Sequence, residues 1–460
     1  MNDLHIVTLG CRLNAAESET MRAHATKAGL AATVIVNGCA VTGEAMRQTR
    51  QAVRRAKRDH PAARIVVAGC AAQIDAPGFA AMPEVDAVIG NDEKMRAQTF
   101  DALAHRLSAS EPIVAVGDIM AQRAPIGHLA TGFDADTRNG HARAFVEVQQ
   151  GCDHRCTFCI IPFGRGNNRS APAGEIVAQI RALVGSGVRE IVLTGVDITG
   201  WGGDLPGAPT LGQLARRILK LVPALGRLRF SSIDVAEIDD DLLRLIADEE
   251  RLLPHLHLSL QAGSDMILKR MKRRHSRAQA IAFCHQVRAL RPDMTFGADL
   301  IAGFPTESDS MFADSLDLVA ACDLAFLHVF PFSARNGTPA ARMPQLPKSL
   351  RKERAAQLRE AGARQRTRYF DTLIGRSITA LVENRRLDRA RGHSDGFAPI
   401  DIACEGAAIG RGALVTARVE VHDGTRLNAR LIDIKDRHET DRHETAAPDR
   451  NAAQRLVSAR

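Results

Sequence analysis

The chain has 460 residues, which is enough for two or three domains with separate hydrophobic cores. Its hydrophobic content of 45% is ordinary for a soluble protein, and no apolar run is long enough to span a membrane. The first residues lack the basic and apolar stretches of a secretory signal, so we expect a cytoplasmic protein with no membrane partner. The net charge of +8 suits an anionic partner, but a diffuse excess of this size does not identify one.

Residues 1–121 alternate apolar strands with helical stretches. The pattern predicts helices at Ala16–Ala28 and Glu44–Arg58 and strands at His5–Leu9, Thr33–Val36, Arg64–Ala68 and Val85–Ile89. The first three strands are about thirty residues apart, the length of a strand–helix–strand unit. We therefore expect an α/β domain with a doubly wound parallel sheet. Residues 122–141 are rich in Pro, Gly, Asp and Thr and are predicted to be a linker.

A second alternating series occupies residues 142–345. Its helices include Ala173–Ser186 and Arg277–Leu290, and its strands are Phe145–Gln149, Glu190–Thr194, Leu228–Ser231, His255–Gln261, Thr295–Ile301 and Leu324–Phe330. Six strand–helix units fit an open, partial (β/α)6 barrel better than a closed eightfold one.

The remaining segments differ in character. A basic helical connector is predicted over residues 346–370, with its helix at Leu350–Arg368. Residues 371–436 are predicted to form a small all-β barrel with strands at Ser377–Val382, Ala413–Thr416 and Arg418–Val421. Residues 437–460 contain a tandem Asp-Arg-His-Glu-Thr repeat and few apolar residues, so we expect disorder there.

Three cysteines, Cys152, Cys156 and Cys159, follow the first strand of the second series in a CxxxCxxC pattern. In a cytoplasmic protein, grouped cysteines indicate metal ligands or reactive thiols rather than disulfides. Three thiolates in one loop can bind three irons of a 4Fe-4S cluster and leave the fourth iron open to a small molecule. A zinc site completed by His154 is the alternative, although structural zinc sites usually use paired CxxC motifs.

Another three cysteines are spread along the first domain. Cys11, Cys39 and Cys70 each follow a glycine at the end of one of the first three strands. Because the carboxyl ends of parallel strands lie at one edge of a sheet, we expect these thiols to converge. The glycines let the backbone turn closely around a cofactor, and the helix N-termini that follow favour thiolates. This predicts a second three-cysteine cluster, with buried core cysteines as the alternative.

The other three cysteines show no such register. Cys284, Cys322 and Cys404 are predicted to be packing residues.

The cysteine pattern and several local strings resemble the methylthiotransferase branch of the radical S-adenosylmethionine (SAM) enzymes, over about residues 4–435. The strings are Gly164-Arg165-Gly166, Leu193–Val196, Ser231-Ser232-Ile233, Leu258–Asp265 and Gly303–Glu307. The β-rich end resembles a TRAM domain, with Gly392–Phe397 at the expected place.

This resemblance implies two 4Fe-4S clusters, with S-adenosylmethionine as the second cofactor. Cys152, Cys156 and Cys159 would hold the cluster that cleaves S-adenosylmethionine to a 5′-deoxyadenosyl radical, and Cys11, Cys39 and Cys70 an auxiliary cluster that carries the sulfur. The residues expected to contact S-adenosylmethionine are Gly195, Ser259 and Gln261 at strand ends and the turn of Gly303, Phe304 and Pro305. The alternative is that these are ordinary turn and inward-facing strand residues.

The methylthiotransferases that this chain resembles act on three substrates: N6-threonylcarbamoyladenosine in tRNA, N6-isopentenyladenosine in tRNA, and an aspartate of a ribosomal protein. The strings Thr8–Asn14 and Cys39–Thr42, followed by Glu44 and Arg47, resemble the threonylcarbamoyladenosine enzymes. The Ser-Ile-Arg and Pro-Lys-Asn strings typical of the other two are absent at the corresponding places. Gly38 and Asn167-Asn168 depart from the family's usual residues.

Basic segments support an RNA partner, and we expect it to be the anticodon arm of tRNA. They are Lys269–Arg274, Lys348–Arg368, and Arg47, Arg50, Arg54, Arg55, Lys57 and Arg58 of the second helix; solvated helix faces are the alternative. Radical chemistry also needs an electron donor such as flavodoxin or ferredoxin, and we expect a monomer. The competing class is a zinc-containing nucleic-acid-binding protein without catalysis.

Overall fold

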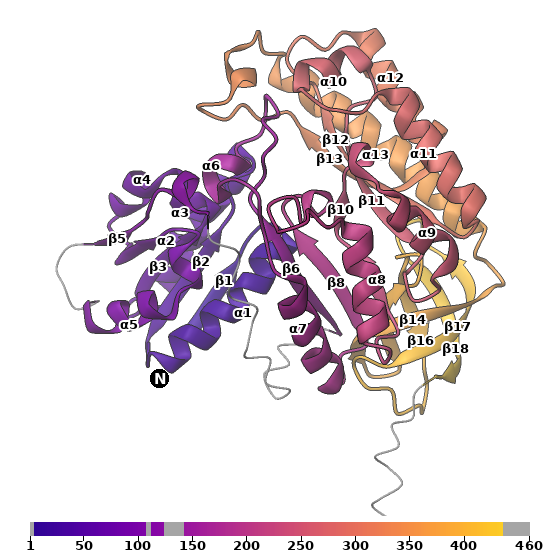
Figure 1. Ribbon diagram of the computed structural model, residues 1–460, viewed down its shortest axis with the longest axis horizontal. Coiled ribbons are helices and arrows are strands. Elements are labelled where there is room, and N and C mark those ends of the chain that lie inside the picture. The colour runs from indigo at the N-terminus through magenta and orange to yellow at the C-terminus, as the bar shows by residue number, and fades with distance from the viewer. Residues whose placement is uncertain (1–3, 107–111, 124–141, 436–460) are drawn as a thin grey trace, which may run out of the picture.

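The computed structural model describes residues 4–106, 112–123 and 142–435. Three units follow one another along the chain: an N-terminal α/β unit, a central partial barrel and a C-terminal β-barrel (Figure 1). The predicted fold class is confirmed. Most of the predicted linker and all of the predicted tail lie outside the described residues.

The N-terminal unit is a five-stranded parallel sheet whose strands follow in chain order. They are β1 (Leu4–Thr8), β2 (Thr33–Gly38), β3 (Arg64–Gly69), β4 (Ala87–Ile89) and β5 (Ile113–Ala115). Helices cover both faces, as the doubly wound prediction requires. One face carries α2 (Gly43–Asp59), α3 (Cys70–Ile74) and α4 (Ala76–Ala80), and the other carries α1 (Arg12–Lys27) and α5 (Ala97–Arg106).

The central unit consists of two four-stranded sheets around one hydrophobic core. The first contains β6 (Arg143–Gln150), β7 (Arg169–Ser170), β8 (Glu190–Gly195) and β9 (Leu228–Phe230). The second contains β10 (Ser232–Ile233), β11 (His255–Gln261), β12 (Thr295–Ala302) and β13 (Leu324–Pro331). The predicted third strand, Leu228–Ser231, corresponds to β9, and the short β10 that follows it was not predicted. β9 pairs with the first sheet and β10 with the second, so together they join the two sheets into one partial barrel.

Helices connect these strands and cover the outside of the barrel (Figure 1). They are α6 (Ile161–Arg165), α7 (Ala173–Gly185), α8 (Leu211–Leu221), α9 (Asp240–Asp248), α10 (Asp265–Met271), α11 (Arg277–Leu290) and α12 (Asp309–Ala321). Capping boxes at Thr210 and Ser276 satisfy orphan amides and begin α8 and α11 at these residues.

The connector helix α13 (Lys348–Asp371) packs along β13 and leads into a closed five-stranded barrel. Its strands are β14 (Ser377–Arg386), β15 (Arg389–Ser394), β16 (Pro399–Ala403), β17 (Leu414–His422) and β18 (Leu427–Ile434). The two strands predicted at Ala413–Thr416 and Arg418–Val421 are one strand, β17, while β15, β16 and β18 were not predicted.

The turn between β15 and β16 docks the C-terminal barrel onto the central one. Arg227 forms an ion pair of 2.5 Å with Asp395, and the Thr295 hydroxyl donates a hydrogen bond of 2.9 Å to the Gly396 carbonyl. The aromatic ring of Phe397 stacks on His255 of β11 with ring centroids 4.7 Å apart. The C-terminal barrel therefore contacts the strands of the central unit directly.

Within the described residues, each helix is too short or too polar to cross a membrane.

Candidate active site

Cys11, Cys39 and Cys70 lie together at the carboxyl edge of the N-terminal sheet, as predicted. Cys11 is the N-cap of α1, Cys39 follows β2, and Cys70 is the first residue of α3. Gly10 has a φ of +98°, and a Cβ there would lie 2.7 Å from the Cβ of Cys39. Only glycine therefore allows this close approach. Burial, together with the neighbouring thiols of Cys70 and Cys11, raises the pKa of Cys39 to about 11.

Cys152, Cys156 and Cys159 lie in one loop between β6 and α6. The Cys159 amide donates a hydrogen bond of 3.0 Å to the Cys156 carbonyl, which tightens the loop. Burial raises the pKa of Cys159 to about 12, and the adjacent Cys156 acts in the same direction. Such desolvated thiols need a strong positive centre to ionise, and a bound metal cluster supplies one.

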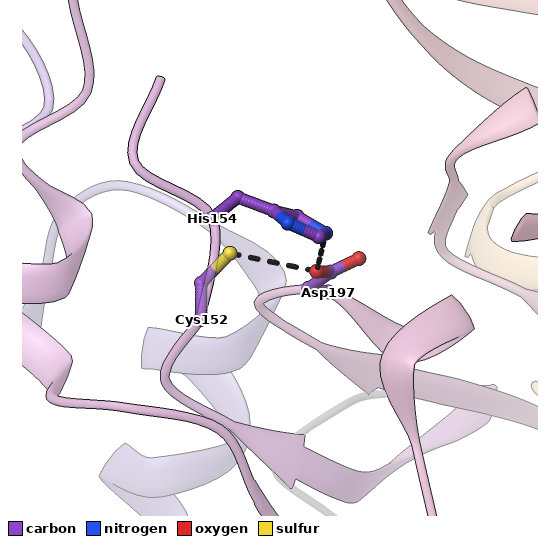
Figure 2. Close-up of side chains that lie close together, drawn as sticks. All are labelled: Cys152, His154 and Asp197. Atoms are coloured by element: carbon purple, nitrogen blue, oxygen red, sulfur yellow. Dashed lines mark hydrogen bonds and ion pairs between the residues drawn. The ribbon is translucent and has the colours of Figure 1, made fainter. Parts of the chain in front are cut away.

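The loop also contains a small polar cluster, shown in Figure 2. Cys152 donates to Asp197 at 3.4 Å, and Nε2 of His154 lies 2.9 Å from the same carboxylate oxygen. Hydrogen bonds to Asp197 and Glu237 raise the pKa of His154 to about 10. The imidazole of His154 therefore already has two carboxylate partners, Asp197 and Glu237.

The spacing of the thiols argues against one zinc ion held by all three cysteines of either triad. A tetrahedral zinc with bonds of about 2.3 Å holds its ligand atoms roughly 4 Å apart. Among the described residues, the groups of three possible ligand atoms within 4.8 Å of one another include Cys152 with His154 and Asp197, but neither cysteine triad. All-sulfur donor sets with this wider spacing fit a cluster of several irons.

Arg165, the last residue of α6, connects the two cysteine sites. Its buried guanidinium donates to both carboxylate oxygens of Glu17, at 2.8 and 2.9 Å, and to Asn14 at 2.7 Å. Glu17 and Asn14 are on α1, whose N-cap is Cys11, whereas α6 follows Cys159 closely. This bidentate pair therefore fixes one cysteine site relative to the other.

Two further ionisable groups, Lys94 and Glu147, complete this junction. Lys94 donates to Glu17 at 2.6 Å. Burial alone would raise the pKa of Glu17, but the charges of Arg165 and Lys94 lower it to about 2. Burial and the charge of Glu17 raise the pKa of the neighbouring Glu147 to about 8. At neutral pH the junction thus holds one ionised and one neutral carboxyl group.

A cavity of about 540 Å³ lies between the N-terminal unit and the partial barrel. Cys11 and Cys39 line it on one side, Gly195 and Ser231 at barrel strand ends on another, and Phe397 of the C-terminal barrel closes it. Gly195 and Val196 line the cavity, and the next residue, Asp197, is the hydrogen-bond partner of Cys152. A volume of this size accommodates a small organic ligand. Cys11 and Cys39 therefore line the cavity, whereas Cys152 approaches it only through Asp197, the residue after Val196.

The residues expected to contact S-adenosylmethionine occupy different surroundings. Gly195 lines the cavity, where a Cβ would lie 2.6 Å from the carbonyl oxygen of Gln149. Ser259 accepts a hydrogen bond from Arg273 through its carbonyl, and Gln261 adopts a φ of +70° at an irregularity in β11.

The Gly303 turn lies away from this cavity wall. Gly303 has a φ of +72° and donates to Glu307 at 3.0 Å. Phe304 is fully buried against Phe332, and Pro305 is buried beside it. Their contact with S-adenosylmethionine remains a prediction.

Many of the basic side chains expected to bind RNA have partners within the protein. On α2, Arg50 pairs with Asp75 and Arg54 with Glu84. On α13, the buried Arg354 forms an ion pair of 2.8 Å with Glu307. These three side chains are therefore already paired within the protein, and the RNA contacts of the basic segments remain a prediction.

The sequence interpretation missed polar residues inside the barrel. Asp299 of β12 accepts hydrogen bonds from His257 of β11 at 3.0 Å and from His328 of β13 at 3.2 Å, and all three line the cavity. His255, His257, Ser259 and Gln261 alternate along β11, so the period of two could have revealed the two histidines. Arg165 and Glu17 are 148 residues apart, and no local pattern links them.

Comparisons with known proteins agree with this arrangement. Residues 146–319 match the radical SAM superfamily, and residues 3–90 match a group described as uncharacterized protein family UPF0004. The chain is 50% identical over 397 residues to "Threonylcarbamoyladenosine tRNA methylthiotransferase MtaB" of Rickettsia prowazekii, covering 86% of this chain and 90% of that protein. A protein of the same name from Aquifex aeolicus is 34% identical over 83% of this chain and 93% of its own length.

A relative with a different substrate in its name is also similar. The "tRNA-2-methylthio-N(6)-dimethylallyladenosine synthase" of Maricaulis maris is 33% identical over 94% of this chain and 98% of its own length. Identities of this size over nearly whole chains show common ancestry. The chain belongs to the radical SAM tRNA methylthiotransferase family.

Proposed function

We propose that this chain adds a methylthio group to C2 of N6-threonylcarbamoyladenosine next to the anticodon of tRNA. The position of the two cysteine triads supports this proposal: Cys11 and Cys39 line the cavity, and Cys152 is bonded to Asp197 next to its wall. Sulfur insertion needs a radical source and a sulfur carrier at the same substrate. The 50% identity to a relative named for threonylcarbamoyladenosine favours that nucleoside over the dimethylallyl one.

The radical SAM domain implies S-adenosylmethionine and one 4Fe-4S cluster. Cys152, Cys156 and Cys159 would hold this cluster, and with S-adenosylmethionine it supplies a radical strong enough to activate a C–H bond. Cys11, Cys39 and Cys70 would hold a second cluster as the source of sulfur. The burial of Cys39 and the lack of room for a larger side chain at Gly10 fit such a group.

The chain's own residues supply position and shelter from water. Arg165 holds α1, and with it Cys11, against α6 of the central barrel. Gln149 accepts hydrogen bonds from the amides of Val196 and Asp197, at 3.0 and 2.7 Å, and so shapes the strand end near Cys152. We assign S-adenosylmethionine to this strand end, to Ser259 and Gln261 of β11 and to the Gly303–Pro305 turn after β12.

The partners follow from this chemistry. tRNA is the substrate, and the C-terminal barrel, a TRAM-like unit, together with the unpaired basic residues would grip its anticodon arm. A small electron donor such as flavodoxin or ferredoxin would reduce the radical cluster. We place the enzyme in the cytoplasm, where charged and modified tRNAs are found, and expect it to act as a monomer.

Nucleoside mass spectrometry tests this function. A host that makes N6-threonylcarbamoyladenosine but lacks its own enzyme for methylthiolation should gain the 2-methylthio derivative when it expresses this chain. A Cys156→Ala variant serves as the inactive control. Appearance of 2-methylthio-N6-isopentenyladenosine alone, or of a modified ribosomal protein instead, would replace the proposed substrate.

A further inference from the structure

The cavity beside Cys11 has an uneven distribution of charge. Arg12 is the one lysine or arginine among the described lining residues, and Asp299 is the one carboxylate. Both hydrogen bonds from His257 and His328 go to Asp299, so its charge is already engaged. The cavity wall therefore presents the positive charge of Arg12, while its one carboxylate, Asp299, is already bonded to two histidines.

Arg12 differs from the other arginines at this junction. Arg143 and Arg229 form ion pairs with the buried Glu190, and Arg229 lies 3.1 Å from its carboxylate. No ion pair within 4.0 Å reaches Arg12 from the described residues. Its guanidinium instead lies over two aromatic rings: Cζ is 5.2 Å from the ring centroid of Phe397 and 5.9 Å from that of Phe145. Such contacts orient a guanidinium but leave its donors available.

His255 provides a second polar group in the same wall. It is 3% exposed, lines the cavity and stacks on the Phe397 ring that Arg12 also contacts. Neither of its ring nitrogens has a hydrogen-bond partner among the described residues. Buried polar groups of native proteins are normally paired, so this imidazole indicates a place for a ligand atom.

These groups match one end of the proposed nucleoside. The threonylcarbamoyl group ends in a carboxylate, whereas an isopentenyl group is a pure hydrocarbon. A planar guanidinium binds a carboxylate through paired hydrogen bonds, and a neutral imidazole can donate one more. We infer that Arg12, with His255, binds the carboxylate of the threonylcarbamoyl group and thereby selects this nucleoside. This inference rests on the proposed function.

The position of Arg12 gives the contact a second consequence. Arg12 is the first residue of α1 and directly follows Cys11, a proposed ligand of the sulfur-carrying cluster. A nucleoside held by its N6 substituent at Arg12 is therefore held close to Cys11. Arg12 is a specificity-determining residue that also limits where the base lies.

Two RNA stem-loops test the inference. One carries N6-threonylcarbamoyladenosine, and the other carries the same nucleoside with the threonine carboxylate converted to its primary carboxamide. The variants are Arg12→Gln and Arg12→Lys, and Arg217→Gln on the exposed face of α8 is the matched control. Binding is measured by fluorescence anisotropy, and methylthiolation by mass spectrometry under anaerobic conditions.

The wild-type enzyme and Arg217→Gln should prefer the carboxylate RNA by roughly tenfold to a hundredfold, as expected for one charge-assisted contact. Arg12→Gln should lose this preference by weakening only the carboxylate RNA, and Arg12→Lys should retain part of it. Full iron content and unchanged S-adenosylmethionine cleavage without RNA would show that the variant is folded.

Two results separate the possible failures. An undiminished preference in folded Arg12→Gln would overturn the role of Arg12 and leave the proposed function intact. Failure of the wild-type enzyme to methylthiolate the carboxylate RNA would overturn the proposed function itself, and the inference with it.

Discussion

The buried charges between α1 and α6 can be tested with one isosteric change, Glu17→Gln. The side chains of Glu17 and Lys94 are fully buried, and that of Arg165 is 2% exposed. The substitution removes the carboxylate that both cations share. Leaving buried charge without its partner costs about 3 to 5 kcal/mol. Ionisation of Glu147, which is suppressed while Glu17 is charged, should offset part of this cost.

A chain of three units has no single well-defined free energy of unfolding. Amide hydrogen exchange is therefore used, because it measures the stability of each segment separately. A loss of about 3 kcal/mol corresponds to roughly a hundredfold faster opening. Peptides of α1 and α6 should therefore exchange about a hundred times faster, while those of β17 and β18 should not change. Glu44→Gln is the matched control, because Glu44 pairs with Arg47 on the exposed face of α2.

The stabilisation by Glu17 should also depend on pH in a definite direction. The pKa of Glu17 is lowered from 4.5 to about 2, so its stabilisation is present above about pH 4.5 and is lost as the pH falls toward 2. Glu17→Gln should lack this acid-dependent loss. Equal exchange of α1 in wild type and variant at neutral pH would refute the argument that this ion pair holds the two units together.

The remaining predictions concern other parts of the molecule. Because the pKa of Glu147 is raised to about 8, its favourable contribution is lost as the pH rises from about 4.5 through 8; Glu147→Gln should therefore melt higher than wild type at pH 9, and an equal or lower midpoint would contradict this. The protein should bind about eight irons, and joint replacement of Cys152, Cys156 and Cys159 by Ala should leave roughly half; iron analysis that finds zinc, or no loss, would exclude two clusters. Phe397→Leu should destabilise the barrel junction by about 1 to 3 kcal/mol through its three arginine contacts, whereas Phe330→Leu in the same cavity should have little effect in thermal unfolding.

The sequence was most informative where chemistry and backbone register coincide. Gly-Cys pairs at three strand ends predicted converging thiols, because parallel strands align their carboxyl ends. The CxxxCxxC loop followed β6 as expected. The helix predicted at Ala16 begins instead at Arg12, since the extended backbone of Cys11 lets it act as the N-cap. An apolar period alone cannot locate such a start.

Contacts between distant segments could not be predicted in the same way. Strand β15, Arg389–Ser394, is rich in Arg, Gly and His and is defined by pairing with β14 and β16 rather than by its own pattern. The basic helix α13 was interpreted as a surface for RNA, yet Arg354 is buried against Glu307. The C-terminal barrel gave no sequence sign that Phe397 would reach the cavity wall. Each of these depends on tertiary packing.

The division of labour between the two cysteine triads is the central claim, and one anaerobic assay tests it directly. Wild-type enzyme and a Cys11→Ala/Cys39→Ala/Cys70→Ala variant are incubated with reductant, S-adenosylmethionine and the threonylcarbamoyladenosine stem-loop. 5′-Deoxyadenosine and methylthiolated nucleoside are then quantified together by mass spectrometry. The account predicts both products from the wild type and only 5′-deoxyadenosine from the variant. Methylthiolated nucleoside from the variant, or no 5′-deoxyadenosine despite a fully occupied radical cluster, would contradict it.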